Sequence, residues 1–407
     1  MFIELHIIQS FPPTNLNRDD MNQPKDCEFG GVRRARISSQ CLKRATRRAP
    51  VFAATTKVDN GFRSRLLARR LIFALKDSGK PQAQVQAVAR AIAGLYTDKT
   101  GQMDRSNPER TKVQVYLSQS DADWTVNRIQ HDWDALVAAL QPTEQPLGTE
   151  KRAKGAKAQK VDLQTSAIGR LVSDLIELTK GHSDAPDIAL FGRMLADRPD
   201  TNILAACQVG HAVSTHALKM DLDFFTAVDE LSCPEETGAA MMDVAGFNSA
   251  CFYRYARLDW LILKRNLGAE DESESEVIEL ARRTVEAFLR ASEAATPTGM
   301  QSGHDNHSRP AFMLAVVRAA DSPGWSLVNA FEKPVEAWSG SGLVEPSILA
   351  LDHYWNGLIE WYGTGTVVST AVAALPAWRP QGLSQNLADA IRPNFEAWVQ
   401  AVVENLP

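Results

Sequence analysis

Several features that would assign the chain to a common enzyme class or to a membrane are missing from its sequence. Its five cysteines lie far apart and form no CxxC pair, so neither a zinc knuckle nor a disulfide framework is predicted. There is no run of about 18 apolar residues, so we expect no membrane span. The first ten residues carry no basic stretch before their apolar residues, which is unlike a secretory signal, and a reducing cytoplasm is the simplest location.

Motifs for common cofactors and catalytic centres are also lacking. The sequence contains no HExxH, no GxxxxGK[ST], no GxSxG and no GxGxxG. We therefore expect no cofactor. The composition is that of an ordinary globular protein, with 44% hydrophobic and 23% charged residues. At about 150 residues per domain, 407 residues predict two to three domains, or one domain with large insertions.

The charge is distributed unevenly along the chain. The net charge of −5 argues against nucleic-acid binding, but residues 29–58 contain eight Lys or Arg and no Asp or Glu. These are Arg33, Arg34, Arg36, Lys43, Arg44, Arg47, Arg48 and Lys57. An excess of Asp and Glu lies at 270–279. Such separation gives one surface a positive potential that the net charge hides.

The hydrophobic pattern predicts strands scattered between helices, typical of an α+β fold with a helical insertion. Strands are expected at 2–9, 33–38, 112–118, 188–195, 250–258 and 311–317. Helices are expected at 38–48, through much of 60–140, and at 164–180, 203–217, 274–292, 345–361 and 384–404. Residues 141–160 have no periodicity and are rich in Lys, Gly, Pro and Gln, which predicts a mobile basic loop.

The segment that is most informative about function is 15-NLNRDDMNQPKDCEFGGVRRARISSQCLKRATRR-48. A Gly-Gly turn precedes a strand that leads into a helix opened by Ser38 and Ser39, where free backbone N–H groups favour an anion. Lys43 and Arg47 are four residues apart on one helix face, and Arg44 and Arg48 form a second row. The arrangement suits a phosphate backbone, while the alternative is a solvated basic helix.

A second informative segment is 221-DLDFFTAVDEL-231. In a strand, Phe224 and Phe225 would face opposite ways, one toward the core and one outward. An outward aromatic side chain near a basic groove is a platform on which a base can stack. The alternative, which the residues alone favour, is that both belong to the core.

Three further groups are interpreted as structural when they are taken alone. In 190-LFGRMLADRPDTN-202, Arg residues can hold phosphates and Met194 can act as an apolar wedge, yet a structural role is favoured. The segment with His304, Asp305 and His307 is interpreted as a polar loop, and a metal site is the alternative. Asp19, Asp20 and Asp26 favour a turn over Mg²⁺ binding.

In combination, these motifs resemble the Cas-seven family, in particular the CasC-type backbone subunits of the type I-E CRISPR Cascade complex. The resemblance rests on NLNRDDMNQPKD, FGGVRRARISSQCLKRA, GRM, GHAVSTHA, DFFTAVDEL, CFYRYARL and NAFEKPV in this order. It implies a modified RRM-like (ferredoxin-like) palm with a helical finger insertion and a thumb loop. The implied domains are 1–59 and 183–407 for the palm, with the thumb at about 193–226, and 60–182 for the finger.

The resemblance also implies which residues bind the guide RNA. They are Arg18 and Lys25 in the loop, Arg34, Arg36, Ser38, Gln40, Lys43, Arg44 and Arg47 in the strand and helix, Met194 as a wedge, and Phe224, Phe225 and Thr226 on the thumb. No catalytic residue, metal or cofactor is implied.

The implied function is a non-catalytic subunit that polymerises along crRNA as a helical filament and presents it for pairing with target DNA. The implied partners are crRNA, target DNA, copies of itself, the large subunit CasA, the small subunit CasB, CasD and the guide-processing CasE. One alternative is a metal-dependent RNA endonuclease of the type III kind, with an Asp of the 19–26 loop as catalytic residue. Another is a self-assembling protein whose basic ridge meets the acidic segment 270–279 of a neighbour.

Overall fold

The chain divides into two units, one built on a sheet and one built of helices. The computed structural model describes residues 1–140, 165–227, 241–269, 275–337, 340 and 342–407. The sheet unit comprises 1–57, 207–261 and 279–407, and the helical unit comprises 58–206 and 262–278. Helices and an antiparallel sheet together make an α+β fold, as predicted. Residues 183–206 pack with the helical unit, whereas the sequence analysis placed them with the palm.

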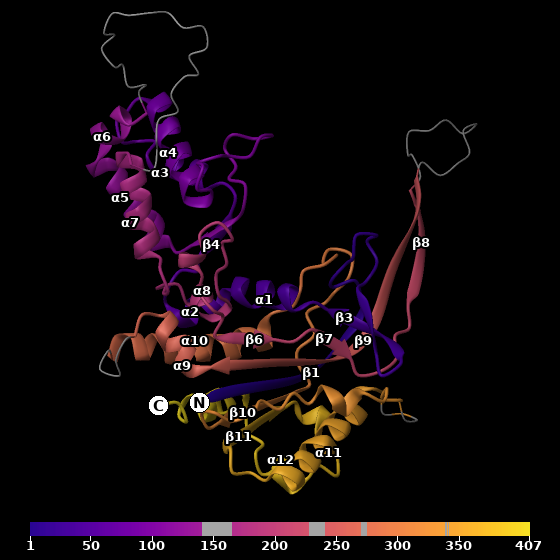
Figure 1. Cartoon of the computed structure of the whole chain (residues 1–407). Helices are drawn as coiled ribbons and strands as arrows, with labels where there is room; N and C mark the ends of the chain where they lie inside the picture. The colour runs from indigo at the N-terminus through magenta and orange to yellow at the C-terminus, as the bar shows by residue number, and fades with distance from the viewer. Residues whose placement is uncertain (141–164, 228–240, 270–274, 338–339, 341) are drawn as a thin grey trace, which may run out of the picture. The chain divides into compact units, whose positions relative to one another are not determined.

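The sheet unit contains a nine-stranded sheet in the order β11-β10-β1-β9-β7-β3-β2, with β6 and β8 also paired to β9 (Figure 1). Its strands are β1 (Phe2–Thr14), β2 (Asp26–Phe29), β3 (Val32–Ile37), β6 (Cys207–Val209), β7 (Ala212–Ser214), β8 (Asp221–Ala227), β9 (Met241–Asp259), β10 (Phe312–Arg318) and β11 (Val367–Ala374). All the pairings between these strands are antiparallel. β9 is the longest strand, and β8, β7 and β6 pair with successive parts of it.

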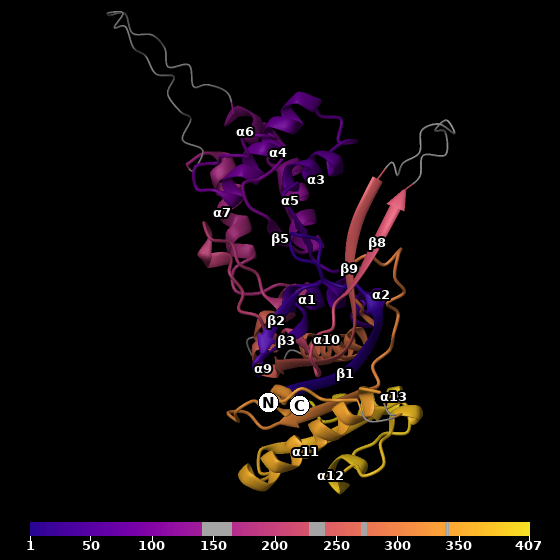
Figure 2. The same cartoon turned by 90° about the vertical axis from the view of Figure 1, so that its right-hand side faces the viewer.

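Helices flank this sheet. They are α1 (Ser39–Arg48), α2 (Pro50–Thr56), α11 (Val344–Tyr362), α12 (Gln385–Ala388) and α13 (Phe395–Val403), with short 3₁₀ turns at Val328–Phe331 and Pro376–Trp378. The helices α9 (Trp260–Asn266) and α10 (Ser275–Ala294) have residues in both units. α11 and α12 lie together beside the strands β10 and β11 in both views (Figures 1 and 2). The single helix predicted at 384–404 is two helices, α12 and α13. The strand β11 has no counterpart among the predicted strands.

The central strand β1 is buried on both of its faces. Ile3, Leu5 and Ile7 share one face, as the alternation predicts, and all three are buried. The polar residues of the other face, Glu4 and His6, are buried as well, whereas alternation is typical of a strand with one face in water. The reason is that both faces of the strand are covered in the tertiary structure.

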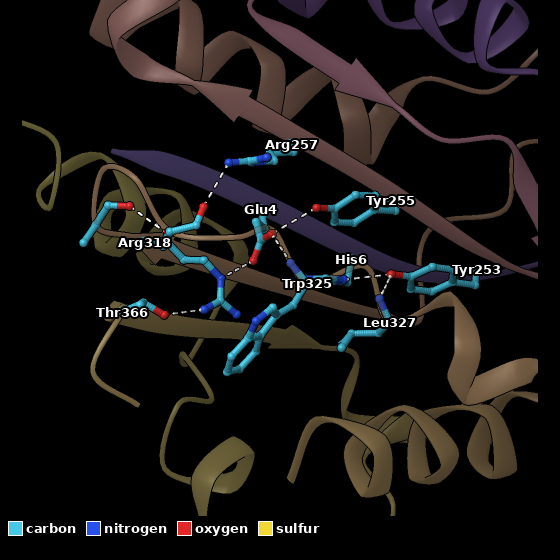
Figure 3. A network of polar contacts seen from close by, with 11 residues as sticks. Glu4, His6, Tyr253, Tyr255, Arg257, Arg318, Trp325, Leu327 and Thr366 are labelled. Carbon is cyan, nitrogen blue, oxygen red and sulfur yellow. Dashed lines mark hydrogen bonds and ion pairs between the residues drawn. The ribbon is translucent and has the colours of Figure 1, made fainter. Parts of the chain in front are cut away.

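A polar network joins the buried groups on that second face (Figure 3), although Nε2 of His6 and Nη2 of Arg318 have no hydrogen-bond partner in the described part of the chain. The guanidinium of Arg318 forms a buried ion pair with Glu4 and donates to the Thr366 hydroxyl at 3.0 Å. Glu4 also accepts from the Tyr255 hydroxyl at 3.0 Å and from the backbone N–H of Trp325 at 2.7 Å. A buried ion pair is tolerated when additional hydrogen bonds satisfy its remaining atoms, and this carboxylate has them.

His6 extends the network along β1. The hydroxyl oxygen of Tyr253 accepts from the Leu327 N–H at 2.8 Å, so its own hydrogen is available for Nδ1 of His6, 2.9 Å away. This arrangement requires an unprotonated Nδ1. Burial lowers the pKa of His6 to about 4, which keeps the ring neutral.

The β2–β3 hairpin and the helix that follows it agree with the sequence pattern. Gly30 and Gly31 form a two-residue turn between Phe29 and Val32, and both have positive φ (61° and 74°). Such turns favour glycine because a Cβ is strained in this conformation. Ser38 caps α1, and Pro50 begins α2 immediately after α1 ends.

The helical unit is built from α3 (Leu67–Ala74), α4 (Gln82–Thr97), α5 (Gln119–His131), α6 (Trp133–Ala138), α7 (Ala167–Leu178) and α8 (Pro186–Phe191). A small sheet of β4 (Phe62–Ser64) and β5 (Val115–Leu117) and a 3₁₀ turn at Pro199–Thr201 complete it. Its core includes the predicted apolar rows of α3 and α4, with Leu67, Leu71 and Leu75 packed near Val85 and Ile92. The helices and the strand predicted here are therefore confirmed.

Two predictions between 188 and 217 are wrong. The strand predicted at 188–195 is the helix α8, and the helix predicted at 203–217 contains the strands β6 and β7. The short apolar run at 188 has no clear period, and β6 and β7 are each three residues long. Such short strands are held by hydrogen bonds to β9, which local sequence does not report.

Some predicted features lie outside the described residues. These are the basic loop at 141–160 and the first half of the acidic segment 270–279. None of the helices in the described part of the chain combines the length and the apolar character that a membrane span requires.

Candidate nucleic-acid interface

One asparagine joins the predicted loop, strand and helix into a single site. The Asn17 side chain accepts from the Ser38 N–H at 2.9 Å, and its carbonyl accepts from the Lys25 N–H at 2.8 Å. The Lys25 carbonyl in turn accepts from the Arg36 N–H at 2.9 Å. Lys25, Arg36 and Ser38 are therefore brought together, although 13 positions separate Lys25 from Ser38.

The first turn of α1 lies at the centre of this positive region. The Ser38 hydroxyl accepts from the Cys41 N–H at 3.3 Å, and the helix has no acidic residue in its first turn. His211, which precedes β7, accepts from the Ser39 N–H at 2.9 Å. Burial and then the charges of Arg36 and Lys25 lower the pKa of His211. The N–H groups of Ser38, Ser39 and Cys41 already have acceptors, so the cations are what favours an anion at this position.

The side chains of α1 lie on three faces of the helix that differ in burial. Leu42 and Thr46 are buried against the sheet unit. Lys43 and Arg47 form a half-buried row, and Gln40 and Arg44 are exposed. The two basic rows predicted from the spacing therefore both reach the surface, as the four-residue repeat requires.

The second row lines a groove of about 1000 Å³ within the sheet unit. The loop at 16–22, α1, the start of α2 and the segment at 294–301 form its walls. Arg18, Arg44 and Arg48 all line it. Arg18 is exposed and donates to the Asn22 side chain at 3.2 Å. Three arginines against one aspartate in the lining, Asp19, make this groove suited to a polyanion.

Arg34 does not fit the predicted contact with guide RNA. It is buried, and its guanidinium donates to four backbone carbonyls, those of Phe29, Ser214, Phe331 and Glu332, at 2.9–3.2 Å. Burial also lowers its pKa. The guanidinium therefore ties the β2–β3 hairpin to distant parts of the sheet unit. The sequence pattern did not separate it from Arg36, because both face the same side of the strand.

The β8–β9 hairpin projects beyond the rest of the sheet with both faces exposed (Figure 1). Phe224 is 63% exposed and Phe225 39% exposed, and Thr226 is exposed as well. The two aromatics point to opposite faces, as predicted, but the expectation that one of them is in the core is wrong. A two-stranded ribbon has no layer behind it, so neither face is covered by the chain itself.

The apolar face of this hairpin includes residues that the sequence analysis missed. Phe224 pairs with Val244 and Thr226 with Met242, so these side chains share one face with Leu222. Leu222, Phe224, Met242 and Val244 are all exposed large hydrophobics. The signal was present in the alternation of 241–247, but the strand was predicted only from 250.

The base of the hairpin is fixed to the predicted RNA-binding loop. A Cβ at Gly246 would lie 1.8 Å from the side-chain oxygen of Gln23, so a larger residue there would require the flexible Gln23 side chain to move. The Asn15 side chain donates to the Gly246 carbonyl at 3.0 Å. The loop that carries Arg18 and Lys25 and the hairpin that carries Phe224 and Phe225 are thus held together in the sheet unit.

Met194 belongs to the helical unit and is 83% exposed. Its neighbour Arg193 is buried, donates to the Thr201 carbonyl at 2.7 Å and also bonds the Thr179 carbonyl. Backbone hydrogen bonds between Arg193 and Ile203, at 2.9 and 3.0 Å, close the loop. Arg193 is therefore structural, and it holds the backbone from which Met194 projects.

The acidic and histidine groups have structural roles in the described chain. The Asp19 carboxylate accepts from the N–H groups of Met21 and Gln23, both at 2.9 Å, which is a turn-forming arrangement. Asp26 forms an ion pair with Arg33. His307 hydrogen-bonds Gln301 at 2.8 Å. In the described ranges no three His, Cys, Asp or Glu side chains group as metal ligands would.

Sequence reasoning missed two members of the site. His211 falls within the helix predicted at 203–217, and it lies instead just before the strand β7, beside α1. Arg48 was noted in the second basic row but not assigned to the site, and it lines the groove with Arg18 and Arg44.

Comparison with known proteins gives a consistent result. A family model described as CT1975-like protein matches residues 3–401. A chain of a "CRISPR RNA-guided surveillance complex, pre-nicking" is 26% identical with a TM-score of 0.79, over 99% of this chain and 99% of that chain. A chain of a "CRISPR RNA-guided surveillance complex" is 23% identical with a TM-score of 0.72, over 100% of both chains, and shares the fold. No curated protein sequence matches the chain.

These matches confirm the resemblance to Cascade backbone subunits of the Cas-seven kind. The sequence motifs, the sheet unit with its hairpin and the helical unit all fall within the matched region. Because the family model covers nearly the whole length of the sequence, the chain belongs to the family of CT1975-like proteins.

Proposed function

We propose that the chain is a non-catalytic backbone subunit of a type I-E Cascade complex, which binds crRNA, polymerises along it and presents it to target DNA. The observation that carries this proposal is the likeness, over 99% of both chains, to a chain of a CRISPR RNA-guided surveillance complex. In such a complex base pairing reads the sequence, so the protein has to hold the backbone and shape of the guide.

The sheet unit has the chemistry that this task requires. Lys25, Arg36 and the basic rows of α1 offer cations to phosphates, and Phe224 and Phe225 offer surfaces on which bases stack. In this proposal the sheet unit is an RRM-like palm and the helical unit is the finger. The thumb is the β8–β9 hairpin, which overlaps only the end of the range at about 193–226 that the resemblance implies.

The exposed hairpin supports polymerisation. Its apolar face, which contains Leu222, Phe224, Met242 and Val244, is costly to leave in water. A neighbouring copy and the guide between the two copies would cover it. The proposed partners are accordingly crRNA, further copies of the chain, target DNA and the other Cascade subunits.

The proposal assigns no catalytic role to the acidic loop. The Asp19 carboxylate is used in a turn and Asp26 in an ion pair, which favours structural roles for both. The alternative of a type III endonuclease requires one of them to hold a divalent ion instead.

The test is purification of the complex by size exclusion, with the A260/A280 ratio measured before and after RNase. We expect a large particle that carries protected RNA of discrete length, and sequencing of this RNA should return repeat-derived guides. A large particle without RNA would instead support self-assembly through the acidic segment 270–279. Cleavage of complementary RNA in Mg²⁺ would support the endonuclease.

A further inference from the structure

A second basic run lies in the helical unit. Residues 60–76 contain five Lys or Arg (Arg63, Arg65, Arg69, Arg70 and Lys76) and no Asp or Glu. The run covers β4 and α3. It is separate from the basic run of α1, and the proposed guide-binding site does not use it.

Two of these cations serve the fold of the helical unit. Arg65 forms an ion pair with Asp104 and donates to the Thr111 carbonyl at 2.8 Å. Arg70 bonds the Gln119 side chain and lies 4.2 Å from the centre of the Phe62 ring. Neither guanidinium is available to a ligand without loss of these contacts.

The other three cations face solvent. Arg69 and Lys76 are exposed on α3 and in the turn after it, and Arg63 is exposed on β4. Within the described part of the chain, none of the three forms an ion pair. An ordinary helix surface mixes both signs, so exposed cations without ion pairs create a local positive potential.

A large aromatic side chain lies within this group. Phe73 is 79% exposed, whereas the opposite face of α3, formed by Leu67, Leu71 and Leu75, is buried. Arg69 and Phe73 are four residues apart on one face of α3, and Lys76 lies in the turn that follows the helix. An exposed phenylalanine between two cations contributes nothing to the core of its own unit.

We infer that α3 and the turn after it bind a single strand of DNA, with Phe73 stacking on an unpaired base and Arg69 and Lys76 contacting phosphates. Cations on both sides of an aromatic ring match a sugar-phosphate backbone with accessible bases. Base pairs inside a duplex offer no free face to the ring, so the aromatic favours a single strand. An acidic protein surface would use the cations but not the exposed ring.

The inference rests on the proposed function for the source of such a strand. Pairing of a guide with one strand of a target duplex leaves the other strand unpaired. The binding surface itself is defined only by α3 and the turn after it, so it can be tested apart from guide binding.

The experiment measures binding of fluorescein-labelled oligothymidylate, which is not complementary to the guide, to the RNA-loaded complex by fluorescence anisotropy. Loss of one stack corresponds to about 1–3 kcal/mol, so Phe73→Ala should weaken binding about 5- to 150-fold. The double variant Arg69→Gln/Lys76→Gln should lower the slope of log K against log salt by about 1.4, at about 0.7 per contact for single strands.

Matched controls separate this surface from general effects. Arg105→Gln/Arg110→Gln removes two exposed cations from the same unit, beside acidic neighbours, and should leave the slope unchanged. Trp361→Ala removes an aromatic that is 82% exposed but follows Glu360, and should leave the affinity unchanged.

The outcomes are distinguishable. Unchanged oligothymidylate binding by both α3 variants overturns the inference. Weaker binding by the charge variant with no effect of Phe73→Ala also overturns it, because the surface would then be purely electrostatic. Smaller particles formed by Phe73→Ala would mean that the ring contacts protein. A wild-type complex that carries no RNA would contradict the proposed function, and the α3 variants would then be compared as RNA-free protein.

Discussion

The imidazole of His211 accepts a hydrogen bond from the backbone N–H of Ser39, at 2.9 Å, in the first turn of α1. The two residues are 172 positions apart in the sequence. The contact satisfies one of the free amides at the helix N-terminus and holds β7 beside the basic helix. Because the acceptor is a histidine, this contact depends on pH.

We predict that acid weakens the fold partly through His211. Burial and the charges of Arg36 and Lys25 lower its folded-state pKa below 6.5. As pH falls through 6.5, the unfolded chain takes up the proton first, so the stability contributed above 6.5 is lost on acidification. The change in melting temperature between pH 7.5 and pH 5.5 should therefore be smaller in His211→Ala than in the wild type. Equal changes would show that the ring is not held neutral.

Guide binding should depend on the first basic row of α1. Replacing Lys43 and Arg47 by Ala removes two proposed phosphate contacts, so the salt slope of guide binding should fall by about 1–2 units. The slope is obtained from RNA titrations at several salt concentrations. Arg379→Ala/Arg392→Ala removes the same charge from the C-terminal part and serves as the control. A slope that does not change in Lys43→Ala/Arg47→Ala would rule out the phosphate assignment.

Stacking on the hairpin should contribute to the binding of every guide alike. Phe224→Ala and Phe225→Ala remove surfaces on opposite faces, and the one that contacts a base should lose about 1–3 kcal/mol of binding free energy. Met194→Ala should also reduce assembly, because an apolar wedge is lost. Fluorescence of 2-aminopurine at successive guide positions should rise periodically in the wild-type complex. A flat signal along the guide, or one untouched by these substitutions, would refute the flipped-base interpretation.

Arg34 should affect stability more than RNA binding. Arg34→Met removes the donors of four backbone carbonyls and leaves buried acceptors unsatisfied, so we expect a loss of about 3 kcal/mol in the free energy of unfolding. Urea unfolding measures this loss. Arg36→Met should cost less stability and weaken guide binding more. The opposite ranking of the two variants would restore Arg34 to the RNA-binding set.

The acidic loop should not support RNA cleavage. Because the Asp19 carboxylate caps a turn and Asp26 pairs with Arg33, the purified complex with Mg²⁺ should leave complementary RNA intact. Gel electrophoresis of end-labelled RNA is the measurement, and Asp26→Ala is the comparison. Regular cleavage that disappears in Asp26→Ala would establish the endonuclease alternative.

Local sequence was sufficient where an element carries its own signals. The Gly30-Gly31 turn, the Ser38 cap and the four-residue basic rows predicted the hairpin, the start of α1 and its exposed cations. These features depend on interactions between residues a few positions apart, so they can be predicted from the local sequence. The same holds for the apolar rows that form the core of the helical unit.

Tertiary structure decided the features that depend on partners distant in the chain. Arg34 and Arg36 have the same spacing pattern, yet only Arg34 meets the carbonyls of Ser214, Phe331 and Glu332 and is buried by them. β6 and β7 are strands because β9 supplies their hydrogen bonds, and His211 joins the site because β7 brings it to α1. The sequence by itself thus determined which residue types the site contains. Contacts between residues distant in the sequence determined which of them reach the surface, because a side chain is buried only where other parts of the chain pack against it.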